Sequence, residues 1–170
     1  MKAFTEADDK AHAYFLIADQ QEHNGDIDGA IKSFRAALDL DPRCKEAPLW
    51  ALNLGFLYQD KRDFDAAIES YQHSIHLGGI PTPRSNAVLY GSLAKMQRKR
   101  GDLDDAIKNY KQSITLDPGY ANSHHGLGIA MMQQGDLVKA AIHIRRALAL
   151  DPGDVAAITN LQAIEAQLMG

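Results

Sequence analysis

The sequence predicts an all-α protein built from a repeated pair of helices. An aspartate-led segment occurs four times, with its first aspartate at Asp26, Asp63, Asp102 and Asp136, so the copies lie 34 to 39 residues apart. Each copy is followed by apolar residues at helical spacing. Of the 170 residues, 45% are hydrophobic and 24% are charged, as expected for a folded chain with a buried core.

The composition also argues against several classes of protein. A net charge of −4 disfavours general nucleic-acid binding, which needs an excess of Lys and Arg on one face. No apolar run approaches the roughly 18 residues of a membrane helix, and the first residues lack the apolar region of a signal peptide. The single cysteine, Cys44, cannot form an internal disulfide, and we interpret it as an incidental thiol. We therefore expect a cytoplasmic protein.

Each copy of the repeat has the start and stop signals of two helices. In the third copy, Leu103, Ala106, Ile107, Tyr110 and Ile114 form one helical stripe. The glycine before the aspartate suits the left-handed end of the first helix, and the aspartate suits the N-cap of the second. Proline then stops the second helix, at Pro42, Pro118 and Pro152.

Small and large residues keep the same register in all four copies, as two helices that cross closely require. The small residues are Ala18, Ala30 and Ala37, then Gly55, Ala67 and Ser74, then Ala94, Ala106 and Ser113, then Gly128, Ala140 and Ala147. The large residues beside them are Phe34, Tyr71, Tyr110 and Ile144.

At these positions the sequence resembles the tetratricopeptide repeat family. The resemblance implies a right-handed α-solenoid of helix-turn-helix repeats that forms one domain over residues 1–170. Its predicted parts are an N-terminal extension (1–10), repeats at 11–44, 48–81, 87–120 and 121–154, and a C-terminal capping helix (155–170). Ile158, Leu161 and Leu168 are expected to cover the last repeat.

The sequence departs from the family pattern at three places. Arg62 replaces the glycine before the second aspartate, so that turn must change its geometry or carry strain of about 1 kcal/mol. Gln21 and Gln97 stand where the family usually has an aromatic residue. Gly78-Gly79 replaces Asp-Pro, and we expect a longer loop over residues 80–86.

Catalytic and metal-binding motifs are absent from the sequence. His124 and His125 are adjacent and point apart on a helix, while His73 and His76 have no further ligand at a suitable spacing. We find no phosphate-binding loop, no nucleophile elbow and no zinc-protease motif. We therefore predict a non-catalytic protein without a cofactor or metal.

The resemblance instead implies protein binding, because in this family the first helices of the repeats line a concave groove that holds a peptide or helix of a partner. Asn53 and Asn160 also match positions where some members hold a ligand backbone. The groove positions that we single out are Phe15, Asp19, Leu52, Asn53, Phe56, Lys95, Arg98, Lys99, His125, Ile129 and Met132.

These residues predict a partner with apolar side chains at one end and acidic groups at the other. Phe15, Leu52 and Phe56 would meet the apolar end, and the basic stripe of Lys95, Arg98 and Lys99 would meet the acidic end. The simpler interpretations are that the apolar side chains pack under the N-terminal segment, that the stripe is solvated surface and that Met132 fills the core.

Members of the family that bind the acidic C-terminal tails of heat-shock chaperones use a clamp of Lys, Asn and Arg side chains. The matching positions hold Phe15, Asp19, Asn53, Val88 and Ser92, of which only Asn53 fits. We therefore predict no specific binding of such tails.

Three interpretations of the whole chain stay open. It is a scaffold or adaptor, a regulatory repeat domain of a larger enzyme, or a secretion-type chaperone. The alanine-rich last helix also suggests self-association, or packing against further C-terminal sequence, although exposed alanines are common.

Overall fold

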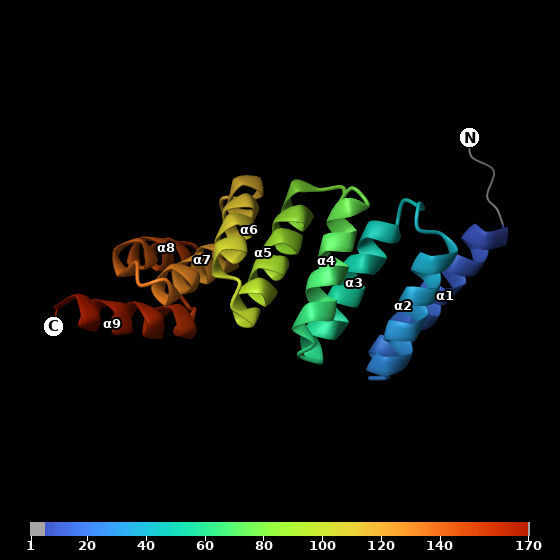
Figure 1. Ribbon diagram of the computed structural model, residues 1–170, viewed down its shortest axis with the longest axis horizontal. Helices are drawn as coiled ribbons and strands as arrows, with labels where there is room; N and C mark the ends of the chain where they lie inside the picture. Colours follow the sequence, from blue (N-terminus) through green and yellow to red (C-terminus); the bar gives the residue numbers. More distant parts are fainter. Residues whose placement is uncertain (1–5, 170) are drawn as a thin grey trace. The chain divides into compact units, whose positions relative to one another are not determined.

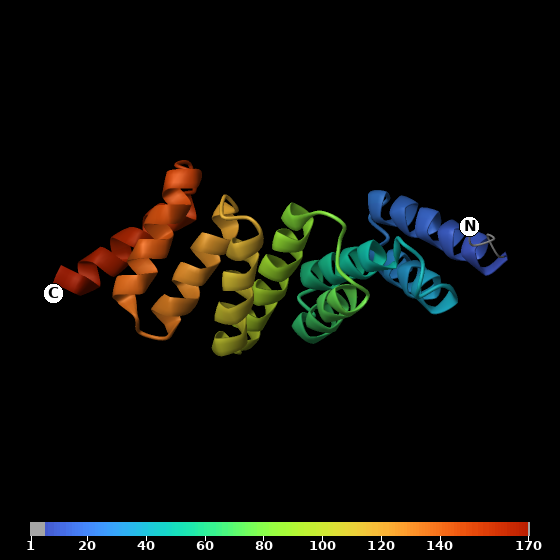
Figure 2. The same ribbon diagram turned by 90° about the horizontal axis from the view of Figure 1, so that it is seen from above.

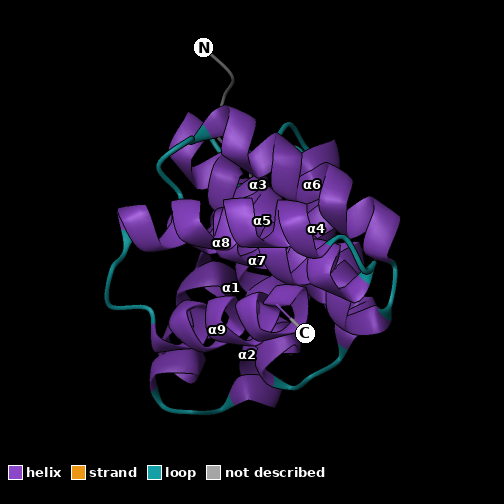
Figure 3. Cartoon of the chain, turned by 90° about the vertical axis from the view of Figure 1, so that its left-hand side faces the viewer, coloured by secondary structure: helices purple, strands orange, loops and turns teal. Residues whose placement is uncertain are grey.

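The computed structural model describes residues 6–169, in which all regular structure is helical (Figures 1 and 3). The all-α prediction is confirmed. The helices in this range are α1 (Glu6–His23), α2 (Ile27–Leu40), α3 (Ala47–Asp60), α4 (Phe64–His76), α5 (Pro83–Arg100), α6 (Leu103–Leu116), α7 (Ala121–Gln133), α8 (Leu137–Leu150) and α9 (Val155–Met169). None of these helices is long and apolar enough to cross a membrane.

The chain divides into two compact units, Met1–Ile80 and Pro81–Gly170, which we call unit 1 and unit 2. The division follows Gly78-Gly79, the place where the sequence departs from the Asp-Pro ending of the other repeats. Residues 1–5 of the predicted N-terminal extension, and Gly170, lie outside the described residues. Residues 6–10 belong to α1.

Unit 1 consists of two helical hairpins, α1 with α2 and α3 with α4, and α2 also packs against α3 (Figure 2). Ala18 and Ala30 are completely buried where the first hairpin crosses, beside the buried ring of Phe34. In the second hairpin, a Cβ on Gly55 would lie 2.4 Å from the Tyr71 ring, so only glycine fits there. The small and large residues thus have the packing roles that their register predicts.

Unit 2 contains the hairpins α5–α6 and α7–α8, followed by α9, which packs on α8 and contacts α7. Ala157 and Ile164 of α9 are completely buried, and Leu161 packs beside them. Ile158 and Leu168, which we expected to cover the last repeat, are instead 38% and 49% exposed. The expectation was wrong for these two residues because the buried stripe runs through 157, 161 and 164, one helical turn apart each time.

Aspartate caps three of the four second helices. The carboxylates of Asp26, Asp63 and Asp136 accept a backbone N–H bond from the residue three positions later, at 2.9–3.1 Å. Asp102 makes no such bond, contrary to prediction, and its carboxylate pairs with Arg100 Nε at 2.5 Å. A charged donor two residues away competes with the cap for the same carboxylate.

Arg62 keeps the geometry that glycine has in the other turns. Its φ is +59°, whereas Gly25, Gly101 and Gly135 have φ of +77°, +105° and +85°. A left-handed backbone costs a residue with a Cβ roughly 1–2 kcal/mol. The second repeat therefore accepts the predicted strain.

The loop between the two units is shorter than we predicted. Gly78 and Gly79 both have positive φ after the end of α4. The Thr82 hydroxyl accepts the backbone N–H of Ser85, and Pro83 occupies the first turn of α5. Because a threonine cap and a proline together start a helix, α5 begins inside the stretch predicted as loop.

The two glutamines that replace aromatic residues are satisfied within their own hairpins. Gln21 Oε1 accepts the Ser33 hydroxyl at 2.7 Å, and Gln97 Oε1 accepts an amide hydrogen of Asn109 at 2.8 Å. Both pairs join a first helix to its second helix twelve residues later. A side-chain hydrogen bond therefore replaces the aromatic packing at this position.

Candidate protein-binding surface

In unit 1, the predicted apolar contacts belong largely to the core. The Phe15 ring stacks on Trp50 with 6.0 Å between ring centroids and is tilted against Phe34 at 6.2 Å. Phe56 places its edge against Tyr71 at 5.7 Å, and Leu52 is only 6% exposed. Leu52 is therefore not available to a ligand, while the half-buried rings of Phe15 and Phe56 keep part of their surface open.

The two polar positions of unit 1 differ in exposure. Asp19 is exposed on α1, and its backbone carbonyl accepts a hydrogen bond from His23 Nδ1 at 2.8 Å. This bond, and then the charge of Asp19, raises the pKa of His23. Asn53 is half-buried on α3. An exposed aspartate at the first of these positions makes this part of unit 1 unfavourable for an anionic ligand.

In unit 2, the first helices of successive hairpins are neighbours, since α5 contacts α7 and α7 contacts α9. Residues at the same repeat position in α5 and α7 are 34 apart in sequence. Lys95 therefore corresponds to Ile129, and Arg98 corresponds to Met132. The register brings predicted contacts of two repeats onto one face of this unit.

That face combines charge with apolar surface. Lys95 and Lys99 are exposed on α5, one helical turn apart, and Ile129 and Met132 on α7 are half-buried. We call these four residues the inner face of unit 2. Two exposed ammonium groups beside partly open apolar side chains suit a ligand with a carboxylate next to an apolar residue.

Arg98 has a different role from the two lysines. It is half-buried, and its guanidinium hydrogen-bonds to Tyr110, which is 3% exposed. Burial raises the pKa of the Tyr110 phenol, and the charge and hydrogen bond of Arg98 act against this. Arg98 thus holds the α5–α6 hairpin together, so part of its donor capacity is already used.

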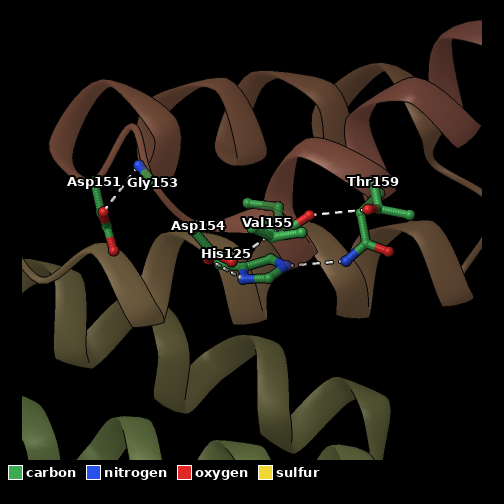
Figure 4. Close-up of polar contacts among 8 residues, drawn as sticks. His125, Asp151, Gly153, Asp154, Val155 and Thr159 are labelled. Carbon is green, nitrogen blue, oxygen red and sulfur yellow. Dashed lines mark hydrogen bonds and ion pairs between the residues drawn. The ribbon is translucent and has the colours of Figure 1, made fainter.

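His125 links α7 to the final helix (Figure 4). Its Nδ1 lies 2.8 Å from Asp154 Oδ2, and its Nε2 lies 2.9 Å from Asn160 Nδ2. The His125 side chain is only 13% exposed. Both His125 and Asn160, which we expected to contact a ligand, therefore hold α9 against α7.

The described residues contain no group of three or more His, Cys, Asp or Glu side chains placed to hold a metal ion. His124 is 7% exposed and stacks on His143 at 5.9 Å, so it faces away from the contacts of its neighbour His125. Burial lowers the pKa of both stacked rings. Burial also raises the pKa of the Cys44 thiol, which disfavours the reactive thiolate.

Paired helices with buried small residues at each crossing, and a mixed charged and apolar face, define a helical-repeat interaction protein. Tetratricopeptide repeat models match residues 11–44, 51–77 and 121–154, and a related repeat model matches residues 94–135. These matches cover well over half of the sequence. The chain belongs to the tetratricopeptide repeat family, and its fold is an all-α helical-repeat solenoid.

Known proteins share this pattern over much of the chain. The BBSome complex member BBS4 of Bos taurus is 31% identical over 112 residues, which are 66% of this chain and 19% of that protein. The chain thus spans about a fifth of this curated relative. A crystal structure of the MamA protein superimposes with a TM-score of 0.82 at 25% identity, over 91% of this chain and 80% of that one.

A second similar structure contains a bound peptide. It is the first repeat domain of Spaghetti (RPAP3) bound to the HSP90 peptide SRMEEVD. It superimposes with a TM-score of 0.68 at 21% identity, over 75% of this chain and 97% of that one. At this identity the likeness concerns the fold.

Two contacts that organise the hairpins were not predicted. The hydroxyls of Ser74 and Ser113 donate to the carbonyls of Pro48 and Ala87, at 2.7 and 2.6 Å, each across 26 residues. From the sequence, both serines are expected only to provide small side chains at the helix crossing. Their shared repeat position, opposite the first residue of each repeat, was the signal that could have identified these contacts.

Proposed function

We propose that this chain is a non-catalytic binding module that holds a peptide or helical segment of a partner protein. Its family is one of protein-interaction scaffolds, and a protein of similar fold carries a bound peptide. The observation that carries the proposal is the inner face of unit 2, where Lys95 and Lys99 are exposed beside the half-buried Ile129 and Met132. These residues favour a segment that carries Asp, Glu or a terminal carboxylate beside an apolar side chain.

The free energy of binding would be the sum of modest contributions from charge pairs and from buried apolar side chains. Exposed charge pairs contribute about 0.2–1 kcal/mol each, whereas an apolar side chain that becomes fully buried contributes about 1.5–3 kcal/mol. The apolar part of the segment would therefore supply most of the affinity, and the lysines would supply orientation and rate of association. Phe15 and Phe56 in unit 1 offer further apolar surface.

A second candidate function is that of a regulatory repeat domain within a larger protein, such as an enzyme. It is favoured by the short share, 19%, that this chain covers of the BBS4 relative. The two candidates agree on the binding surface and differ in what the surface controls. The length of the native gene distinguishes them.

The test starts from a library of synthetic peptides in which acidic and apolar residues are varied independently. The best binder is then measured by fluorescence anisotropy against a double variant, Lys95→Glu with Lys99→Glu. The matched control is Lys108→Glu with Lys111→Glu, the same charge change on exposed residues of α6. We expect the first pair, and not the control, to weaken binding and to remove its dependence on salt.

Met132→Ala and Phe56→Ala separate the two units as sources of apolar contact. Circular dichroism confirms that each variant keeps its helices. The proposal fails if the folded Lys95/Lys99 variant binds like the wild type at low salt, or if no peptide in the library binds.

A further inference from the structure

The outer side of α1 exposes apolar residues at positions that are buried in other repeats. Ile17 is 48% exposed, whereas Leu54 and Leu127, at the same repeat position, are 7% and 0% exposed. Leu54 belongs to α3, which packs on α2, and Leu127 belongs to α7, which packs on α6. The exposed side of α1 is thus the side that other first helices place against a preceding second helix.

Tyr14 lies on the same side of α1, three residues before Ile17. It is 40% exposed, whereas Ala51 and His124, at the same repeat position, are 0% and 7% exposed. Leu16 is also 55% exposed, but it points to a different side of the helix. Two large apolar side chains one turn apart, both at positions that other repeats bury, make a patch rather than a scattered exposure. We call Tyr14 and Ile17 the α1 patch.

A second exposed apolar pair lies on α8, where the other repeats are charged. Val138 is 61% exposed and Ile142 is 58% exposed, one helical turn apart. The residues at the position of Val138 in the other repeats are Asp28, Asp65 and Asp104, and those at the position of Ile142 are Lys32, Glu69 and Lys108. We call Val138 and Ile142 the α8 patch.

The two helices carry opposite charge. Helix α1 contains five carboxylates, at Glu6, Asp8, Asp9, Asp19 and Glu22, and one lysine, Lys10. Helix α8 contains three cations, Lys139, Arg145 and Arg146, and no carboxylate. Lys139 and Arg145 pair with Asp136 and Glu165 at 2.6 Å, but both cations are well exposed, and such surface pairs exchange partners at little cost.

We propose that the α1 patch of one copy of this chain docks on the α8 patch of a second copy. The apolar side chains cover one another, and the acidic helix lies against the basic one. Pairing α1 with α1, or α8 with α8, would instead bring like charges together, which is unfavourable. Helix α9 also exposes apolar residues, but its only charged residue is Glu165, so charge does not select it as the partner of α1.

The contact joins two different surfaces, so each copy in a pair still has one patch uncovered. Association of this kind continues into rings or open chains rather than stopping at a symmetric dimer. This behaviour distinguishes the proposal from every pairing of a face with itself. It also leaves the inner face of unit 2 outside the contact, so this inference is independent of the proposed function.

The test uses two double variants of the full chain. The α8 variant, Val138→Asp with Ile142→Lys, introduces the residue types that the first and third repeats already have at these positions. The α1 variant, Tyr14→Lys with Ile17→Lys, removes the apolar patch and reverses the local charge. Glu69→Lys, at the same repeat position on α4, is the control because it changes charge at an exposed site away from both patches.

Sedimentation equilibrium measures the mass of each protein as concentration rises, at low and high salt. We expect wild type and the control to grow beyond a dimer, less so at high salt, and each double variant to remain monomeric with unchanged helicity. A mixture of the two variants should form a dimer, since the α8 patch of one and the α1 patch of the other are intact. A wild type that stays monomeric up to its solubility limit overturns the proposal, as do a variant that still self-associates and a mixture that stays monomeric.

Discussion

At the scale of single residues, the same side-chain type has different roles in neighbouring positions. His125 is held between Asp154 and Asn160, whereas His124, the next residue, is buried against His143. His124 Nε2 donates to the Pro118 carbonyl at 3.1 Å, and its Nδ1 has no hydrogen-bond partner. A buried ring with one unsatisfied nitrogen disfavours a second proton.

This arrangement predicts that acid destabilises unit 2. Burial lowers the folded-state pKa of His124 and His143 below the ordinary value of 6.5, so the unfolded chain binds more protons as pH falls. The stability contributed by the neutral rings is present above pH 6.5 and is lost as pH falls from 6.5 towards the folded-state pKa. Urea unfolding on either side of this pH measures the loss.

The variant His124→Tyr with His143→Asn should reduce this loss, because it introduces the residue types that the third repeat has at Tyr90 and Asn109. His73→Asn, at an exposed site on α4, should leave the loss unchanged. An equal acid sensitivity in wild type and the double variant would show that the stacked pair is not its source.

At the scale of helices and turns, the four repeats form the same turn and the same start of the second helix with different residues and contacts. An aspartate precedes the second helix in each repeat. The carboxylate of Asp102, however, pairs with Arg100 and accepts no capping hydrogen bond from the backbone of α6. Three of the turns before these helices use glycine, and one uses Arg62 in the same left-handed backbone. Local differences of this kind change stability without changing the fold.

Replacing Arg62 with glycine should therefore stabilise unit 1. Glycine adopts a positive φ without a steric cost, so we expect a gain of up to about 1 kcal/mol in the free energy of unfolding. The reverse change, Gly135→Arg, is the matched control in unit 2, where nothing lies within 4 Å of the added Cβ. We expect it to lose a similar amount. Denaturant midpoints measure both changes, and a destabilising Arg62→Gly would show that the Arg62 side chain makes a contact that outweighs the strain.

At the scale of the whole molecule, ligand choice depends on residues that several repeats contribute. The clamp for acidic chaperone tails needs basic and amide side chains, and the corresponding positions here are Phe15, Asp19, Asn53, Val88 and Ser92. Phe15 packs on Trp50, and the exposed Asp19 repels a carboxylate. A shared fold is thus compatible with a different ligand.

We expect the peptide SRMEEVD, which is bound to the RPAP3 domain of similar fold, to show no specific binding to this chain in calorimetry. Tight binding of the peptide to the unaltered chain would contradict the prediction.

The sequence by itself determined most of the helix ends and the close crossings within the hairpins, although α1 and α5 begin earlier than predicted. Glycine, aspartate and proline set the ends of helices through local backbone geometry, and small residues such as Ala18 and Gly55 mark crossings through their spacing. These helix ends and crossings depend on residues within one repeat. Because the same pattern occurs four times, it can be recognised in the sequence. Exposure follows from position alone for Lys95 and Lys99, which are exposed on α5, and their contact with a ligand stays a prediction.

The tertiary structure decided which candidate residues remain available to a ligand. Arg98 bonds Tyr110, Leu52 is buried, and His125 bonds Asp154 and Asn160. Each outcome depends on a contact between side chains that are far apart in sequence, and such a contact is fixed only when the helices pack. A single helical position predicts the direction of a side chain, whereas the partner it meets depends on the neighbouring helix.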